Sequence, residues 1–271
     1  MKKLTNNIWG ILYPIVVYYL ISSLAFFGMT ILFGESNEIY MLKQMVSSGS
    51  TIPFLLALKK QDAYAEEVVY GKERRMTLKE GACLAVLVFF SMAVLGMALN
   101  NFIAMTPLMQ VSTGFQNANE AFFGGGVLFE LLASCIVVPV AEELLFRGIL
   151  LKRCSYLVGE NWGVVFSAVL FGIIHVNLVQ FIYATLLGLL LAVLVQKTKR
   201  IWTAVLGHVA VNLMAIIRTE TGIFDFSYEA DFAGIGFSLM LLGMGMGILW
   251  VGIRFCRRIF EADGNEEKRI S

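Results

Sequence analysis

The chain has 271 residues, of which 58% are hydrophobic and only 15% are charged, and its net charge is +1. Its mean hydropathy is +0.75, whereas an ordinary soluble domain carries roughly 25% charged residues. The composition therefore excludes a soluble globular domain and indicates an integral membrane protein. The small net charge gives no indication of nucleic-acid binding.

Apolar runs long enough to cross a bilayer as helices recur along the chain. Eight candidate spans are expected, at residues 8–33, 39–58, 81–103, 121–151, 162–176, 178–196, 201–217 and 235–255. The first is too long for a signal-peptide core and is followed by no small-residue cleavage site, so we expect a retained helix. The expected fold is an all-α polytopic bundle.

The distribution of cations predicts the orientation of these spans, because Lys and Arg concentrate in short cytoplasmic loops. With both termini in the cytoplasm, all but three of the 21 Lys and Arg residues fall in cytoplasmic segments, the exceptions being Lys43, Arg147 and Arg218. We therefore expect a multi-pass protein of the cell membrane. The polar stretch 59–80 is expected to be an amphipathic connector rather than a domain.

The whole chain is expected to form one integral membrane domain. Residues 1–120 would hold the N-terminal spans and the cytoplasmic loop, 121–218 the functional core, and 219–271 the last span and a charged tail. The sequence "GMGMG", residues 243–247, has small residues four apart, a pattern that lets a neighbouring helix approach closely.

The four cysteines show no C-x-x-C spacing. We expect free thiols that pack in the protein or face lipid, as is usual for scattered cysteines. They are Cys83, Cys135, Cys154 and Cys256.

Polar groups inside the apolar spans are the informative residues, because a charge near a helix centre costs about 2.5 to 3.5 kcal/mol on insertion scales. Lys43 and Glu130 lie near the outer ends of their helices, where we expect them to snorkel to the interface. The remaining polar groups within apolar segments are Glu142, Glu143, Arg147, His175, His208 and Asn212.

Four of these residues are expected at similar depth in the membrane. Helical rise from the nearest cytoplasmic marker gives roughly 15, 20, 12 and 18 Å for Glu142, His175, His208 and Asn212. All four therefore fall in one layer, on the cytoplasmic side of the midplane or near it, where they could meet.

Helix geometry separates the two glutamates. Neighbouring residues point about 100° apart, whereas residues four apart share a face. Glu143 is therefore expected to form an ion pair with Arg147, which leaves Glu142 as the free carboxylate. His208 and Asn212 are also four apart, so both donors are expected to face one way.

Two further residues are expected to shape the cavity around these groups. Pro139 removes a backbone hydrogen bond and disfavours helix before it, so we expect a kink or break there that presents Glu142 to a cavity. Phe171 lies one turn from His175 and is expected to form part of the cavity wall.

The chain contains "EELLFR", "FGIIH" and "HVAVN" in this order on three hydrophobic segments. These resemble the E-E-x-x-x-R, F-x-x-x-H and H-x-x-x-N motifs of the CPBP family, which comprises the type 2 CAAX prenyl proteases and the bacteriocin-processing membrane peptidases. The resemblance covers about residues 138–212, and no motif position departs from the pattern.

The resemblance implies an eight-helix intramembrane endopeptidase whose site opens to the cytosolic side. It further implies that Glu142 and His175 activate the attacking water, and that His208 and Asn212 form an oxyanion hole. Glu143 and Arg147 would be supporting residues. The implied substrate is a peptide or a lipidated peptide reached from membrane lipid.

Two alternatives stay open at this point. Glu142, His175 and His208 could hold a divalent metal such as zinc, which commonly takes three protein ligands and a water at catalytic sites. No H-E-x-x-H motif is present, and a metal-free, glutamate-dependent hydrolase is the expectation we favour. The polar layer could instead serve a non-proteolytic scaffold, an immunity factor or a proton-coupled carrier.

Overall fold

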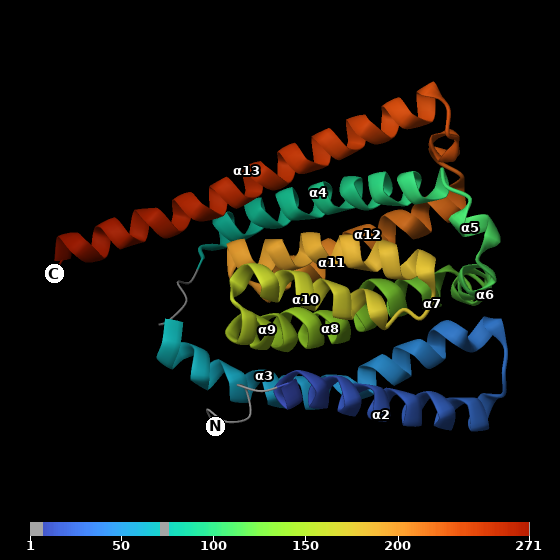
Figure 1. Ribbon diagram of the computed structural model, residues 1–271, viewed down its shortest axis with the longest axis horizontal. Coiled ribbons are helices and arrows are strands. Elements are labelled where there is room, and N and C mark those ends of the chain that lie inside the picture. The colour runs from blue at the N-terminus through green and yellow to red at the C-terminus, as the bar shows by residue number, and fades with distance from the viewer. Residues whose placement is uncertain (1–7, 71–75, 271) are drawn as a thin grey trace.

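The apolar segments predicted from the sequence fall largely within helices in the computed structural model (Figure 1). The structure describes residues 8–70 and 76–270, and for 64–70 and 260–270 it describes the backbone only. No strand occurs in these ranges, which confirms the all-α prediction. Helices suit a membrane because they satisfy their own backbone hydrogen bonds where no water is present.

The helical elements follow one another with short connections. In chain order they are α2 (Ile8–Phe33), η1 (Asn37–Ile39), α3 (Tyr40–Tyr70), α4 (Leu78–Ala104), α5 (Leu108–Val111), α6 (Thr113–Phe122), α7 (Val127–Leu132), η2 (Ala133–Val137), α8 (Val138–Glu143), η3 (Leu144–Leu150), α9 (Leu151–Val158), α10 (Glu160–Ile173), α11 (Leu178–Thr198), α12 (Ile201–Thr221), η4 (Asp225–Tyr228) and α13 (Phe232–Ile270).

Among the described residues, five helices are long and apolar enough to cross a membrane: α2, α4, α11, α12 and the Phe232–Ile259 part of α13. A sixth span is obtained if Thr113–Phe122 and Val127–Val158, which meet at 104°, are counted together. The chain is thus a multi-pass membrane protein. The count of eight spans and the cytoplasmic placement of the termini remain predictions, since α10 is only 14 residues long and α3 is less apolar.

The helices pack in successive layers (Figure 1). Helix α13 lies along α4, which packs in turn against α12, and α10 packs against α11. The α2–α3 hairpin forms the layer on the opposite side of the bundle from α13. Helix α2 begins and α13 ends toward the same end of the bundle, as the predicted topology requires.

Glycines bring the inner helices close together. A side chain at Gly96 would lie 2.9 Å from Val211, and one at Gly207 would lie 2.9 Å from Met92, so α4 and α12 touch through these positions. The "GMGMG" sequence does bring a neighbouring helix close, but not at the two glycines four apart that were predicted to do so. Gly243 and Gly247 have nothing within 4 Å, whereas a side chain at Gly245, between them, would lie 2.7 Å from Leu95 of α4.

A buried arginine attaches the α2–α3 hairpin to the rest of the bundle. Arg153 of α9 donates to both carboxylate oxygens of Asp62 at 2.8 and 3.0 Å, and to the carbonyl of Gly10 at 2.7 Å. The predicted cytoplasmic cation at this position therefore joins α2, α3 and α9.

Lys43 and Glu130 do not snorkel, and that prediction was wrong. Lys43 is 3% exposed and donates to the carbonyl of Gly34 at 2.6 Å, just past the end of α2. A cation is favoured there because the carbonyls at a helix C-terminus carry partial negative charge. Glu130 is fully buried, because neighbouring helices of the chain, rather than lipid, surround it.

The polar connector and the cysteines agree with the predictions. Helix α3 continues to Tyr70, and α4 begins after Thr77, whose side chain forms a capping box with Glu80. Residues 71–75 of the connector lie outside the described residues. All four cysteines are free thiols, with Cys83 exposed and the other three buried.

Candidate active site

The central element of the site is a helical segment that runs without interruption from Val127 to Val158. It contains two π-helical stretches, η2 and η3, on either side of the short helix α8 that carries both glutamates. Each π turn accommodates an extra residue and often occurs at functional sites. Of the kink or break predicted at Pro139, the break is absent, because the helical segment continues through this proline, with the π segment η2 just before it. The sharp bend lies at residues 123–126.

Glu143 and Arg147 form the predicted ion pair, with Arg147 Nη1 2.9 Å from Glu143 Oε1 and both side chains fully buried. Arg147 Nη2 donates to the carbonyl of Gly188 in α11 at 3.1 Å. The guanidinium also lies 4.4 Å from the centre of the Phe171 ring. These contacts offset part of the cost of burying the pair, although Glu143 Oε2 and Arg147 Nε are buried without a hydrogen-bond partner.

His208 of α12 joins the two adjacent glutamates. Its Nδ1 lies 2.9 Å from Glu143 Oε1, and its Nε2 lies 3.9 Å from Glu142 Oε2. Because the Glu143 carboxylate also accepts from Arg147, His208 Nδ1 is the donor in their hydrogen bond. One imidazole therefore has a carboxylate at each nitrogen. Glu142 is the more accessible of the two, with a side chain 14% exposed against 0% for Glu143.

His175 lies outside the helix in which it was predicted. Helix α10 ends at Ile173, and His175 lies in the turn that follows, before Val176 with a positive φ of 65°. His175 Nδ1 is 2.8 Å from the carbonyl oxygen of Phe171. Since a carbonyl can only accept, Nδ1 carries the proton and Nε2 is left as an acceptor in the neutral ring.

Phe171 connects the two histidines. The centre of its ring lies 5.0 Å from that of His175 and 5.9 Å from that of His208, both in edge-to-face arrangements. With the guanidinium of Arg147 over the same ring, Phe171 forms a buried wall shared by the residues of all three motifs.

Asn212 lies one turn beyond His208 on the same face of α12. Its Nδ2 donates to the backbone carbonyl of Ser134 at 2.7 Å. Helix α12 is thus bonded to the 127–158 segment at two points, Glu143 and Ser134, which lie on either side of Glu142 in the chain. This bond uses one of the two amide protons of Asn212.

Reasoning from the sequence missed two residues of this site. Gly188 accepts from Arg147, and a side chain there would lie 3.2 Å from the guanidinium. Tyr18 of α2 is 5% exposed and packs in the same hydrophobic cluster as Phe171 and as Ala141, the residue next to Glu142. The only signal in the sequence was a hydroxyl in an apolar span, which a tyrosine at the membrane interface would show equally.

Glu142, His175 and His208 were the residues that could hold a metal ion according to the sequence. Among the residues that the structure describes, no group of three or more His, Cys, Asp and Glu side chains is placed to hold a metal ion. His175 and His208 each use Nδ1 for a hydrogen bond within the protein, which leaves each imidazole one nitrogen for any ligand. The described donors therefore do not make up a three-ligand set.

These observations define a class: a multi-pass membrane protein with a carboxylate–imidazole site buried between its helices. Residues 124–214, which contain all three motifs, match the family model described as type II CAAX prenyl endopeptidase Rce1-like. This segment is therefore similar to the Rce1-like, or CPBP, family, the resemblance that the motifs indicated.

A relative agrees with this assignment. The chain is 32% identical over 87 residues to a Bacillus subtilis (strain 168) protein named "Putative membrane peptidase YdiL". The aligned part is 32% of this chain and 36% of that protein, so the likeness spans about a third of each. No solved structure matches the chain.

Proposed function

We propose that this protein is an intramembrane endopeptidase that hydrolyses a peptide bond with water activated by Glu142. The observation that carries the proposal is the division of labour between two neighbouring carboxylates. Glu143 is buried and paired with Arg147, whereas Glu142 is partly exposed beside His208. The match of this segment to a family of endopeptidases supports the same reaction.

The first step is the attack of water on the substrate carbonyl. Glu142 accepts a proton from the water while the oxygen forms a bond to the carbonyl carbon, and the π electrons of the carbonyl move to its oxygen. His175 assists by accepting a hydrogen bond from the same water at Nε2, the nitrogen that the Phe171 carbonyl leaves unprotonated. A positioned general base of this kind typically contributes about 10²- to 10⁴-fold in rate.

The negative oxygen of the tetrahedral intermediate requires donors, which we assign to His208 and Asn212. Because His208 Nδ1 donates to Glu143, its Nε2 can donate only when both ring nitrogens carry a proton. Asn212 retains one amide proton beyond its bond to Ser134. Preorganised donors of this kind act mainly on the transition state.

In the second step the intermediate collapses. The carbonyl re-forms, the carbon–nitrogen bond breaks, and the proton held by Glu142 passes to the departing amine. Glu142 is then ionised again, and the products are a carboxylic acid and an amine, which become a carboxylate and an ammonium when the acid's proton passes to the amine. No step of this scheme uses a metal, and metal analysis of purified protein with activity measured in strong chelator tests that choice.

The substrate class that we propose is a peptide cut near the cytosolic face of the membrane. Because the matched family is named for CAAX prenyl endopeptidases, a peptide with a lipidated C-terminus is one substrate to test. Unmodified peptide precursors are another.

The function is tested by comparing the membrane-associated peptides of cells that produce wild-type protein, Glu142→Gln or Glu130→Gln at equal levels. Mass spectrometry is expected to find cleavage products with wild type and Glu130→Gln that are absent with Glu142→Gln. Glu130 is a matched control because it is a buried glutamate of the same helical segment that belongs to no motif. Identical peptide sets in all three strains would favour a scaffold, immunity or carrier function.

A further inference from the structure

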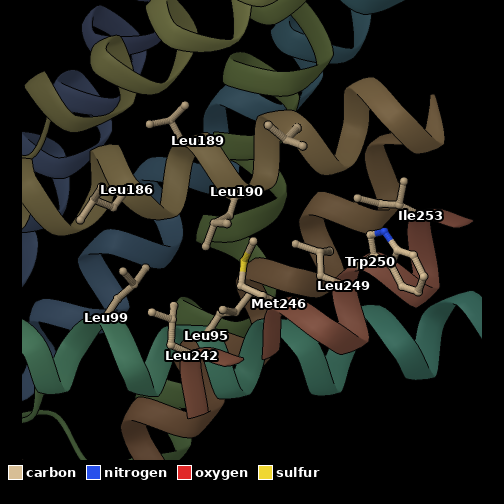
Figure 2. Close-up of a pocket in the computed structure, with 11 residues that line it drawn as sticks. Leu95, Leu99, Leu186, Leu189, Leu190, Leu242, Met246, Leu249, Trp250 and Ile253 are labelled. Carbon is tan, nitrogen blue, oxygen red and sulfur yellow. The ribbon is translucent and has the colours of Figure 1, made fainter. Parts of the chain in front are cut away.

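A groove on the far side of α11 from the candidate active site is lined by apolar side chains, mostly leucines (Figure 2). It lies between α4, α11 and α13 and encloses about 400 Å³. Helix α11 separates the two sites, since its Gly188 contacts Arg147 while Leu186 and Leu190 line the groove. None of the lining residues is charged.

The groove is elongated along the helices. Leu186 and Leu242 lie at one end, whereas Trp250 and Ile253 lie at the other (Figure 2). The α13 residues that line it span eleven positions, which corresponds to roughly 16 Å of helix. Met246 and Trp250, 48% and 58% exposed, lie on the open side that faces lipid in a membrane. This shape fits an extended chain rather than a compact ligand.

A second, basic cavity adjoins the groove at Trp250, which lines both. This cavity encloses about 280 Å³ and shares Trp250 with the first, and Arg254 and Arg258 line it. The Arg254 guanidinium stacks on the Trp250 ring at 4.6 Å. No acidic residue lines either cavity. Trp and Arg together are typical of the level of lipid headgroups at the cytoplasmic surface.

We propose that these two cavities form one binding site for a phospholipid with an anionic headgroup. An acyl chain occupies the groove, and the phosphate lies against Arg254 and Arg258. The size of the groove argues against a helix of another protein as the occupant. A helix 10 to 12 Å across and roughly 16 Å long would need on the order of 1,000 Å³. The charge of the second cavity favours an anionic over a zwitterionic headgroup.

The site can be tested through the fluorescence of Trp250. The full-length protein in detergent micelles is titrated with phosphatidylglycerol or phosphatidylcholine carrying bromine in mid-chain, which quenches nearby tryptophans. The quenching of Trp250 is the difference between wild type and Trp250→Phe. We expect phosphatidylglycerol to half-quench it at about one tenth of the mole fraction that phosphatidylcholine requires, because each arginine near the membrane contributes to the attraction for anionic lipid.

Two sets of variants distinguish the contribution of the lipid headgroup to binding from that of the acyl chain. Arg254→Gln with Arg258→Gln is expected to remove the preference for phosphatidylglycerol, whereas Arg257→Gln, on the same helix but lining neither cavity, is expected to keep it. Val193→Phe, which fills the groove, is expected to reduce quenching by both lipids, and Leu186→Phe repeats that test at the other end if the first variant unfolds.

Equal quenching of wild-type Trp250 by the two lipids would overturn the proposal, since it describes general contact with surrounding lipid. A preference that survives the double arginine variant would overturn it as well. Neither result depends on whether the protein cleaves peptides, because the readout is lipid contact alone.

Discussion

Two arginines, Arg147 and Arg218, are buried in apolar helices of this protein, and their partners differ. Both are at most 1% exposed. Arg147 lies against the Glu143 carboxylate, which also accepts from His208. Arg147, Glu143 and His208 are therefore three ionisable groups joined by hydrogen bonds. A fourth group, Glu142, lies 3.9 Å from the other nitrogen of the imidazole.

Arg218 instead donates its hydrogen bonds to neutral oxygens, and the Asp225 carboxylate also contributes to its electrostatic environment. The arginine donates to Asn101 Oδ1 at 2.8 Å, to Ser227 Oγ at 3.0 Å and to the carbonyl of Phe224 at 3.3 Å. The Tyr228 ring lies 4.1 Å from its guanidinium, and burial raises the pKa of the Tyr228 phenol although the arginine opposes this. These contacts join α4, α12 and η4.

The comparison shows that a buried charge does not by itself identify a reactive site. The hydrogen-bond acceptors of Arg218 are an amide, a hydroxyl and a backbone carbonyl, which do not exchange protons near neutral pH. The hydrogen bonds of Arg147 and Glu143 lead instead to an imidazole, whose other nitrogen lies 3.9 Å from a partly exposed carboxylate. Proton transfer requires such an imidazole and carboxylate, and the hydrogen bonds of Arg218 described above reach neither.

The largest effect is expected from breaking the Glu143–Arg147 pair. Glu143→Gln or Arg147→Met leaves one buried charge without its partner, which typically costs about 3 to 5 kcal/mol of unfolding free energy. The double variant strands no charge, so its loss should be smaller than the sum of the two single losses. Thermal unfolding in detergent for all four proteins measures this difference.

A substitution that keeps the size and shape of the side chain serves as the control in the same experiment. Glu142→Gln is expected to leave the unfolding temperature close to that of wild type, because the ion-pair contact of Glu142 among the described residues is the 3.9 Å one with His208. Strictly additive losses for Glu143 and Arg147, or a large loss for Glu142→Gln, would show that the two carboxylates have been assigned the wrong way round.

A smaller effect, on rate, is expected from Asn212→Ala. Loss of an oxyanion donor typically lowers kcat by about 10²- to 10³-fold with little change in KM, because the contact forms in the transition state. The bond to Ser134 is also lost, so unfolding must be measured alongside turnover. Unchanged kcat with a raised KM would instead place Asn212 in substrate binding.

Asn212→Asp serves as the matched variant. It keeps the size of the side chain but removes the amide donor and adds negative charge. If Asn212 only fastened α12 to Ser134, both variants would lower stability and leave the turnover per folded molecule unchanged.

Several features of this fold and site could be predicted from the sequence, for reasons visible in individual residues. The pairing of Glu143 with Arg147 follows from their separation within one helix, and a local rule is enough to find it. The contact between His208 and Glu143 depends on how α12 is rotated against a helix 65 positions earlier in the chain. Helical periodicity within a single segment contains no information on that rotation.

The errors have equally specific causes. The predicted break at Pro139 assumed an ordinary α-helix, whereas η2 places a π segment just before this proline. Lys43 and Glu130 were assigned to the interface from depth alone, although the surrounding helices bury both. The closest approach on α13 is at Gly245 because the α4 residue Leu95 packs there, and neither flanking glycine faces that helix.

The smallest effect is expected from Arg218→Met, and it tests the comparison most directly. The acceptors that this variant leaves behind are the neutral oxygens of Asn101, Ser227 and Phe224, so no buried carboxylate loses an ion-pair partner at 2.9 Å as Glu143 does in Arg147→Met. The loss of unfolding free energy should therefore be below that of Arg147→Met, which strands the Glu143 carboxylate. Cleavage per folded molecule should equal that of wild type, because Arg218 contacts none of the motif residues through the bonds described above. Slower turnover by an Arg218→Met protein that stays folded would mean that the two clusters are coupled through α12, which carries both Arg218 and Asn212. The distinction between a reactive and a structural buried charge would then fail for this protein.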